Sequence, residues 1–130
     1  MITAIDTNII VRLIARDDPS KYVQAKDLVG STVCFVPETV LLEVAWVLKS
    51  GYGASRSQIH AELTAVLGLP NIRVTDPERI RKALQWYAEG LDFGDALHLS
   101  TCQHLSHMKT FDQRFIKRAA GKGTCAVEPI

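Results

Sequence analysis

Cysteine is scarce in this sequence of 130 residues, and its placement excludes two classes of small protein. Only three cysteines occur, Cys34, Cys102 and Cys125, and no two of them form a Cys-x-x-Cys pair. An odd number of widely spaced cysteines does not build a disulfide framework or a structural zinc site. The pattern is typical of a reducing compartment, so we expect a cytoplasmic protein.

Long hydrophobic runs and an excess of either charge are also missing. No uncharged apolar stretch reaches about 18 residues, so we expect no membrane span. Asp6, Asn8 and Arg12 interrupt the apolar N-terminal segment, which therefore does not resemble a secretory signal. Lys and Arg number 15 against 14 Asp and Glu, a net charge of +1. Any contact with nucleic acid must come from a local basic patch.

The order of the expected elements indicates one α/β domain over residues 1–130. This length and a hydrophobic fraction of 47% suffice for a single core, and no linker or repeat divides the chain. Short apolar runs, read as strands, alternate with helical segments, which predicts a parallel sheet covered by helices on both faces. Strands are expected near 2–5, 32–36, 72–74, 108–111 and 125–127. Beyond the first helix, which opens at Asp6, helices are expected near 19–29, 37–50, 55–67, 77–90, 92–105 and 112–120.

Asp6 stands where the first strand ends and the first helix begins. The carboxyl end of a strand in an α/β sheet is where ligands and metals bind. A carboxylate in this position can also act only as the N-cap of the helix. Asp112 repeats the arrangement after the strand near 108–111, and the same two interpretations apply to it. Thr7 and Thr110 place hydroxyl groups near the same strand ends.

Glu43 lies in the middle of a helix that is apolar almost all round, Val40-Leu41-Leu42-Glu43-Val44-Ala45-Trp46-Val47-Leu48. Such a helix is expected to be largely buried. An ionised carboxylate there needs a cation, either a metal ion or a basic side chain such as an arginine. A partly exposed helix face is the alternative.

Asp92 and Asp95 open the sixth helix. Asp92 is a good N-cap, and Asp95 at the third helical position complements the helix dipole. Asp95 also begins an apolar face, so its carboxylate can point over the edge of the sheet. His98 follows one turn later and is expected to border the acids, whereas the other histidines, His60, His104 and His107, fit surface positions.

Acidic side chains from four separate segments favour a site for a hard divalent cation. Mg²⁺ and Mn²⁺ prefer oxygen ligands. Because no phosphate-binding glycine loop accompanies the acids, they indicate metal-assisted hydrolysis of a phosphodiester.

The four acidic segments together resemble the acidic motifs of PIN-domain nucleases. They are Ala4-Ile5-Asp6-Thr7-Asn8, Glu43 in its apolar helix, Phe93-Gly94-Asp95-Ala96-Leu97 and Thr110-Phe111-Asp112-x-x-Phe115. All four occur in order over nearly the whole chain, whose length is similar to that of the VapC toxins of bacterial toxin–antitoxin modules. By matching position, the resemblance implies that the metal-binding and catalytic residues are Asp6, Glu43, Asp95 and Asp112.

The resemblance further implies a three-layer α/β/α sandwich and Mg²⁺- or Mn²⁺-dependent cleavage of RNA. Asn8, Asp92 and Thr110 match positions that support the acids. A VapB-like antitoxin and a homodimer are the implied partners. The apolar helical hairpin over residues 37–67 has more apolar surface than one sheet-facing stripe requires, which fits such partners.

The last long helix supplies a candidate RNA-binding surface. Arg114, Lys117 and Arg118 fall on one helix face, Lys109 and Lys122 lie nearby, and only Asp112 is expected to oppose them. Phe111 and Phe115 are expected to anchor the other side of the helix. A merely solvated basic face is the alternative.

Three other functions compete with a nuclease. A catalytically inactive PIN-like module could bind RNA or protein, although such a module has no need for Glu43 in an apolar helix. A phosphoacceptor receiver domain requires an acidic pair after the first strand, where Asp6 stands alone. A phosphatase of the haloacid-dehalogenase type requires Asp-x-Asp, where this chain has Asp6-Thr7-Asn8.

Overall fold

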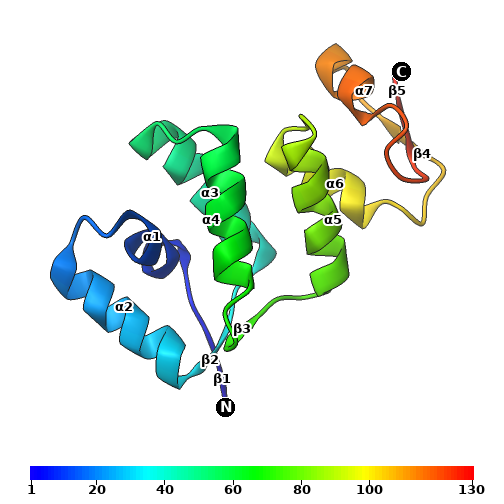
Figure 1. Cartoon of the computed structure of the whole chain (residues 1–130). Helices are drawn as coiled ribbons and strands as arrows, with labels where there is room; N and C mark the ends of the chain where they lie inside the picture. The colour runs from blue at the N-terminus through cyan, green and yellow to red at the C-terminus, as the bar shows by residue number, and fades with distance from the viewer. The chain divides into compact units, whose positions relative to one another are not determined.

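The computed structural model describes all residues, 1–130, and the chain forms two compact units (Figure 1). The first unit spans Met1–Thr75 and the second spans Asp76–Ile130. Each unit combines helices with a small parallel sheet. None of the helices has the length and apolar character that crossing a bilayer requires.

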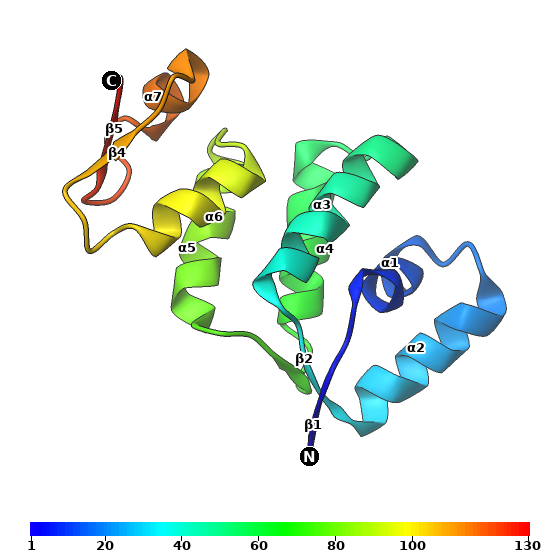
Figure 2. The same ribbon diagram turned by 180° about the vertical axis from the view of Figure 1, so that it is seen from behind.

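The first unit contains a three-stranded sheet in the order β1-β2-β3. Its strands are β1 (Ile2–Ala4), β2 (Val33–Phe35) and β3 (Ile72–Arg73), and both pairs are parallel. Its helices are α1 (Thr7–Ala15), α2 (Pro19–Ser31), α3 (Glu38–Tyr52) and α4 (Arg56–Leu67). Seen from behind, β1 leads directly into α1, which lies beside α2 (Figure 2).

Local sequence signals explain where these helices begin and end. The Asp18 carboxylate accepts a hydrogen bond from the Lys21 N–H, 3.1 Å away, and starts α2. Ser55 and Gln58 form a capping box at the start of α4, as their spacing predicts. Gly53 ends α3 with a φ of 64°, a left-handed conformation that glycine adopts without strain.

The core of the first unit lies where the sheet meets α1, α3 and α4. Its fully buried side chains include Ile10, Cys34, Leu41, Ile59 and Leu63. The α3–α4 hairpin therefore presents one face to this core, and that face fixes the rotation of α3 about its axis.

The second unit contains a two-stranded sheet and three helices. Its strands, β4 (His107–Lys109) and β5 (Ala126–Glu128), pair in parallel, and its helices are α5 (Pro77–Ala88), α6 (Phe93–Thr101) and α7 (Gln113–Ala119). Helices α5 and α6 pack together through buried apolar side chains such as Ile80 and Leu99. The rings of Tyr87 and Phe93 add a tilted contact, with centroids 5.4 Å apart.

The predicted α/β class and the parallel pairing of strands are confirmed, and every expected helix and strand is present. The largest error concerns α6, which ends at Thr101 and not near residue 105. The Gln103 amide Nε2 donates a hydrogen bond to the Leu99 carbonyl, 3.0 Å away, and thereby replaces the next turn of the helix. The placement of all residues in one domain stays a prediction.

Candidate metal-binding and catalytic site

Asp6 follows β1 and occupies the N-cap position of α1. Its backbone is extended, as a cap requires, but its side chain accepts no hydrogen bond from an N–H of the helix. The interpretation of Asp6 as a simple helix cap is therefore wrong. Its carboxylate is exposed and is available to a ligand.

Thr7 connects the start of α1 to Glu43 on α3. The Thr7 side chain is buried, and its hydroxyl donates a hydrogen bond to Oε1 of Glu43. This contact places the Glu43 carboxylate beside the residue that follows Asp6. Helices α1 and α3 pack directly on each other, so the contact belongs to an established helix–helix interface.

The expectation that Glu43 is buried in an apolar helix is wrong. The buried face of α3 consists of Leu41, Val44, Ala45 and Leu48. Glu43 lies on the exposed side, together with Leu42 and Trp46. Its partner is the neutral hydroxyl of Thr7, not an arginine, so no buried charge has to be compensated.

Asp92 and Asp95 lie at the start of α6 in the second unit. Asp92 is the N-cap, and its Oδ2 accepts a hydrogen bond from the Asp95 N–H at 3.2 Å, which confirms the predicted cap. Burial raises the pKa of Asp95, and the carboxylates of Asp92 and Asp112 raise it further, whereas His98 lowers it. Three acids therefore repel one another electrostatically in this region, and a cation would relieve the repulsion.

Asp112 follows β4 and caps α7. Its Oδ1 accepts hydrogen bonds from the N–H groups of Arg114 and Phe115, at 3.0 and 3.1 Å. The Thr110 hydroxyl accepts a hydrogen bond from the Asp112 N–H at 3.0 Å and fixes the preceding turn. The cap interpretation holds for Asp112, but the two capping hydrogen bonds use only one of its two carboxylate oxygens.

A pocket of about 350 Å³ brings Asp95 and Asp112 together in the second unit. His98 also lines it, next to the acids that it was expected to border. No sequence pattern indicated Cys102 and Met108, which line the same pocket from the C-cap of α6 and from β4. The remaining lining residues are Thr101, Lys109, Thr110 and Phe115.

The site residues expected from the sequence thus fall into two groups. The first unit holds Asp6, Asn8 and Glu43, and Glu43 contacts Thr7, the residue between Asp6 and Asn8. In the second unit lie Asp92, Asp95, Thr110 and Asp112. Neither unit by itself gathers three or more His, Cys, Asp or Glu side chains into a group that could hold a metal ion.

The basic surface around α7 is smaller than the sequence indicated. Lys109 forms an ion pair with Glu128 at 2.8 Å, and Lys122 forms one with Glu89 at 3.2 Å. The expectation that Asp112 alone opposes these cations is therefore wrong.

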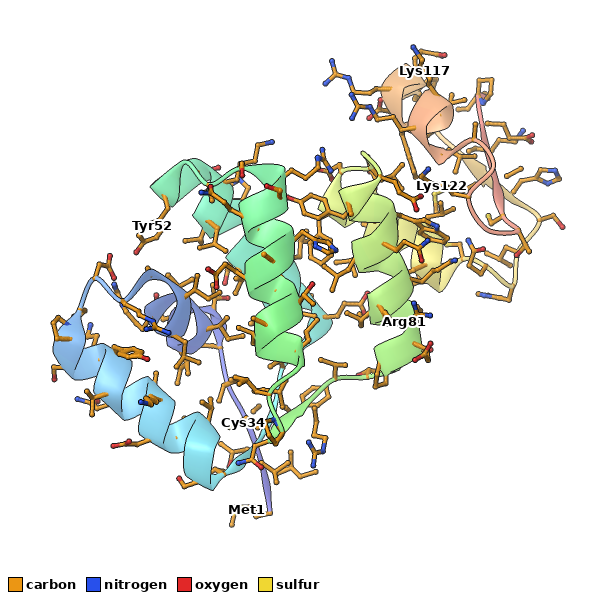
Figure 3. The ribbon with its side chains drawn as sticks, viewed as in Figure 1. Met1, Cys34, Tyr52, Arg81, Lys117 and Lys122 are labelled. Atoms are coloured by element: carbon orange, nitrogen blue, oxygen red, sulfur yellow. The ribbon has the colours of Figure 1, made fainter.

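The three cations on α7 itself have different surroundings. Arg118 Nη1 donates to the Gly90 carbonyl at 2.7 Å. Arg114 and Lys117 are exposed, and Lys117 lies in the last turn of α7 (Figure 3). Phe115 is buried as expected, but Phe111 is 83% exposed and does not anchor the helix.

Comparison with known proteins identifies the family. The family model described as "PIN domain" matches residues 3–121, a range that includes all four candidate acids and most of both units. No curated protein matches the chain.

Two solved structures are similar. One is VapC20 of Mycobacterium tuberculosis, described as a toxin that cleaves the sarcin–ricin loop, with 23% identity, a TM-score of 0.45, and coverage of 94% of this chain and 96% of that one. The other is VapBC2 from Rickettsia felis bound to a promoter DNA fragment, with 20% identity, a TM-score of 0.42, and coverage of 99% and 98%. By the match of the family model over most of its length, this chain belongs to the PIN domain family.

Proposed function

We propose that this protein is a metal-dependent endoribonuclease that hydrolyses RNA phosphodiester bonds, and that it is the toxin of a VapBC-type toxin–antitoxin pair. The observation that supports a catalytic role most directly is the free carboxylate of Asp6. It stands at a strand end and at a helix N-terminus, yet it does not cap the helix. A structural acid in that position would be expected to accept an N–H hydrogen bond.

Asp6, Glu43, Asp95 and Asp112 would hold Mg²⁺ or Mn²⁺. Their donor atoms are carboxylate oxygens, the ligands that these ions prefer. The raised pKa of Asp95, caused by burial and by the nearby Asp92 and Asp112 carboxylates, indicates a place where a cation is favoured. When bound, the ion supplies the positive charge and water activation that phosphodiester hydrolysis requires.

The chain's own contacts suggest a role for each residue around these acids. Thr7 orients the Glu43 carboxylate through its hydrogen bond. Asp112 uses Oδ1 to cap α7 and keeps its second oxygen for the ion. Thr110 fixes the turn before Asp112, and Asp92 fixes the first turn of α6 that presents Asp95. Asn8, one residue beyond Thr7, supplies an exposed amide near the same helix end.

We further propose a VapB-like antitoxin and a homodimer as partners. The α3 helix leaves Trp46 65% exposed and Leu42 36% exposed on its outer face, which is apolar surface that a partner can cover. An arginine or lysine from an antitoxin tail would neutralise the carboxylates of Asp6 and Asp95 and compete with the metal ion. Light scattering tests the dimer, and co-purification with a small protein from the neighbouring gene tests the antitoxin.

Cleavage of labelled RNA by the purified protein tests the proposed activity. We expect cleavage with Mg²⁺ or Mn²⁺, no cleavage in a chelator, and no cleavage by Asp6→Asn with either ion. Asp27→Asn, which changes an exposed acid on α2, is the matched control and should cleave like the wild type. Full activity of Asp6→Asn would contradict the assignment of the site.

Thermal unfolding with and without Mn²⁺ separates the nuclease from the inactive PIN-like binding module. The nuclease predicts a higher melting temperature with Mn²⁺, and Glu43→Gln should reduce that increase. Because Glu43 is exposed, the same substitution should leave the melting temperature without metal nearly unchanged. An unaltered melting temperature of the wild type with Mn²⁺ would favour the binding module.

A further inference from the structure

A second pocket lies in the first unit, between α1 and α2. It has a volume of about 410 Å³ and combines three apolar with four polar lining residues. None of the lining side chains is a carboxylate. From α1 they are Asn8, Ile9 and Arg12, and from α2 they are Lys21, Gln24, Ala25 and Leu28.

Arg12 is held in place from one side but keeps an unused donor. Its Nη1 lies 3.0 Å from Oδ1 of Asp17, and the other Asp17 oxygen accepts the Tyr52 hydroxyl at 2.8 Å. Both contacts lower the pKa of Asp17, the Tyr52 hydrogen bond most strongly. The Arg12 Nε is buried and has no hydrogen-bond partner. Buried N–H groups are nearly always satisfied, so the unpaired Nε marks Arg12 as a guanidinium group whose hydrogen-bonding capacity the fold does not use up.

The other polar groups of the pocket also favour an anion. Lys21 is exposed, and no carboxylate pairs with its ammonium group. Asn8 and Gln24 contribute amides, of which Gln24 makes only a long contact of 3.4 Å to Ser20. Two cations and two amides therefore line one pocket, and the guanidinium group among them suits the planar, two-point binding of an oxyanion.

We infer that this pocket binds an RNA phosphate that neighbours the one being cleaved. The inference rests on the proposed ribonuclease activity. Asn8 lies two residues after Asp6, and Arg12 lies six residues after Asp6, about 9 Å along the axis of α1. A strand with its reacting phosphate at Asp6 can therefore follow α1 and place a phosphate one or two nucleotides away against Arg12 and Lys21. Ile9, Ala25 and Leu28 offer apolar surface to the sugar or base.

A carboxylate from an acidic peptide is the other oxyanion that the pocket could accept. RNA is favoured because the donors continue directly from the helix end that presents Asp6. RNA also carries one phosphate per nucleotide, so an RNA strand bound at Asp6 brings further phosphates within reach of the pocket.

Binding of a short labelled RNA by the full-length protein, without added metal so that no cleavage occurs, tests the inference. Lys21→Glu should weaken binding at low salt at least tenfold and should reduce the slope of log K against log salt by about 0.7 for each phosphate that the variant no longer neutralises. Lys26→Glu reverses a charge on the same helix outside the pocket and should bind RNA within twofold of the wild type. Arg12→Lys, which removes the Nε donor and keeps the charge, should also weaken binding; its melting curve establishes that the variant is folded.

Steady-state cleavage with Mn²⁺ distinguishes failure of this inference from failure of the proposed function. If the wild type cleaves RNA but Lys21→Glu and Lys26→Glu bind it equally well, the pocket assignment is wrong and the ribonuclease stands. If the wild type binds RNA through Lys21 but cleaves none, the proposed function is wrong and the pocket remains a phosphate site. If a glutamate-rich peptide binds in a Lys21-dependent manner and RNA binding does not depend on Lys21, the occupant is a protein and the inference is overturned.

Discussion

Thr7 on α1 donates a hydrogen bond to Oε1 of Glu43 on α3 and so joins two segments that are 36 residues apart in the chain. The threonine is buried, whereas the glutamate is exposed. The buried Thr7 therefore fixes the position of the exposed Glu43 carboxylate. Under the proposed function, Thr7 is a positioning residue that acts through Glu43.

Substitution of Thr7 by valine should reduce RNA cleavage about tenfold, because a hydrogen bond to a charged group contributes about 1.5 kcal/mol. Valine keeps the shape of the side chain and removes the donor. Thr7→Ser restores the hydroxyl and should recover most of the activity. Cleavage rates at saturating Mn²⁺ provide the measurement, and equal rates for the valine and serine variants would show that the contact has no role in the reaction.

Asp6→Ala and Asp112→Ala should have different effects on stability without metal. Asp112 accepts two backbone N–H groups at the start of α7, so its loss should cost about 1 kcal/mol. This cost corresponds to a melting temperature lower by roughly 4 °C for a protein of this size. Asp6 makes no such contact, and its alanine variant should melt within about 2 °C of the wild type. Thermal unfolding in a chelator tests both, and an equal loss for the two variants would mean that Asp6 also caps its helix.

Asp95→Asn should stabilise the metal-free protein at neutral pH. Burial, together with the Asp92 and Asp112 carboxylates, raises the pKa of Asp95 in the folded protein. When folding raises the pKa of an acid, the charged acid destabilises the fold by its full amount at any pH above the folded-state pKa. The destabilisation declines as the pH falls below the folded-state pKa, and it is gone below the unfolded-state pKa.

After allowance for solvent screening, the gain in melting temperature should be about 2 °C at pH 7 and near zero at about pH 3. Thermal scans across this pH range, with Asp27→Asn as the matched control, give the measurement. A gain that persists at the lowest pH would point to a cause other than the charge of Asp95.

The exposed cations of α7 should contribute to RNA binding unequally. Arg114 and Lys117 face solvent, whereas Arg118 donates to the Gly90 carbonyl. The double variant Arg114→Ala/Lys117→Ala should bind RNA more weakly and with a smaller salt slope, lower by roughly 0.7 for each phosphate that it leaves without a cation. Arg118→Ala should mainly lower the melting temperature. Filter binding over a salt series measures the slope, and an unchanged slope in the double variant would place the RNA elsewhere.

The order and type of the elements were determined by the sequence because the signals are local. Asp18-Pro19 and the Ser55–Gln58 capping box act within one helical turn, and Gly53 ends α3 through its own backbone conformation. Neighbouring residues alone provide such signals. The acidic motifs were visible for the same reason, since each occupies a short segment.

Tertiary structure decided what each acid does within those motifs. Asp6 and Asp112 look alike in sequence, because each follows a strand and precedes a helix. Only the side chain of Asp112 turns toward the helix N–H groups, which leaves Asp6 free. Glu43 stands in a segment that reads as apolar on all sides, but packing against the core selects Leu41, Val44 and Leu48 and turns Glu43 outward.

Partners that are distant in the chain were likewise decided only by the fold. In the sequence, Lys109 and Lys122 have no evident acidic partner. In the folded chain, Glu128 of β5 pairs with Lys109, and Glu89 at the end of α5 pairs with Lys122. The pocket of Arg12 and Lys21 exists only because α1 and α2 pack side by side. Sequence patterns report the neighbours of a residue along the chain, whereas charge pairing and pocket formation depend on neighbours in space.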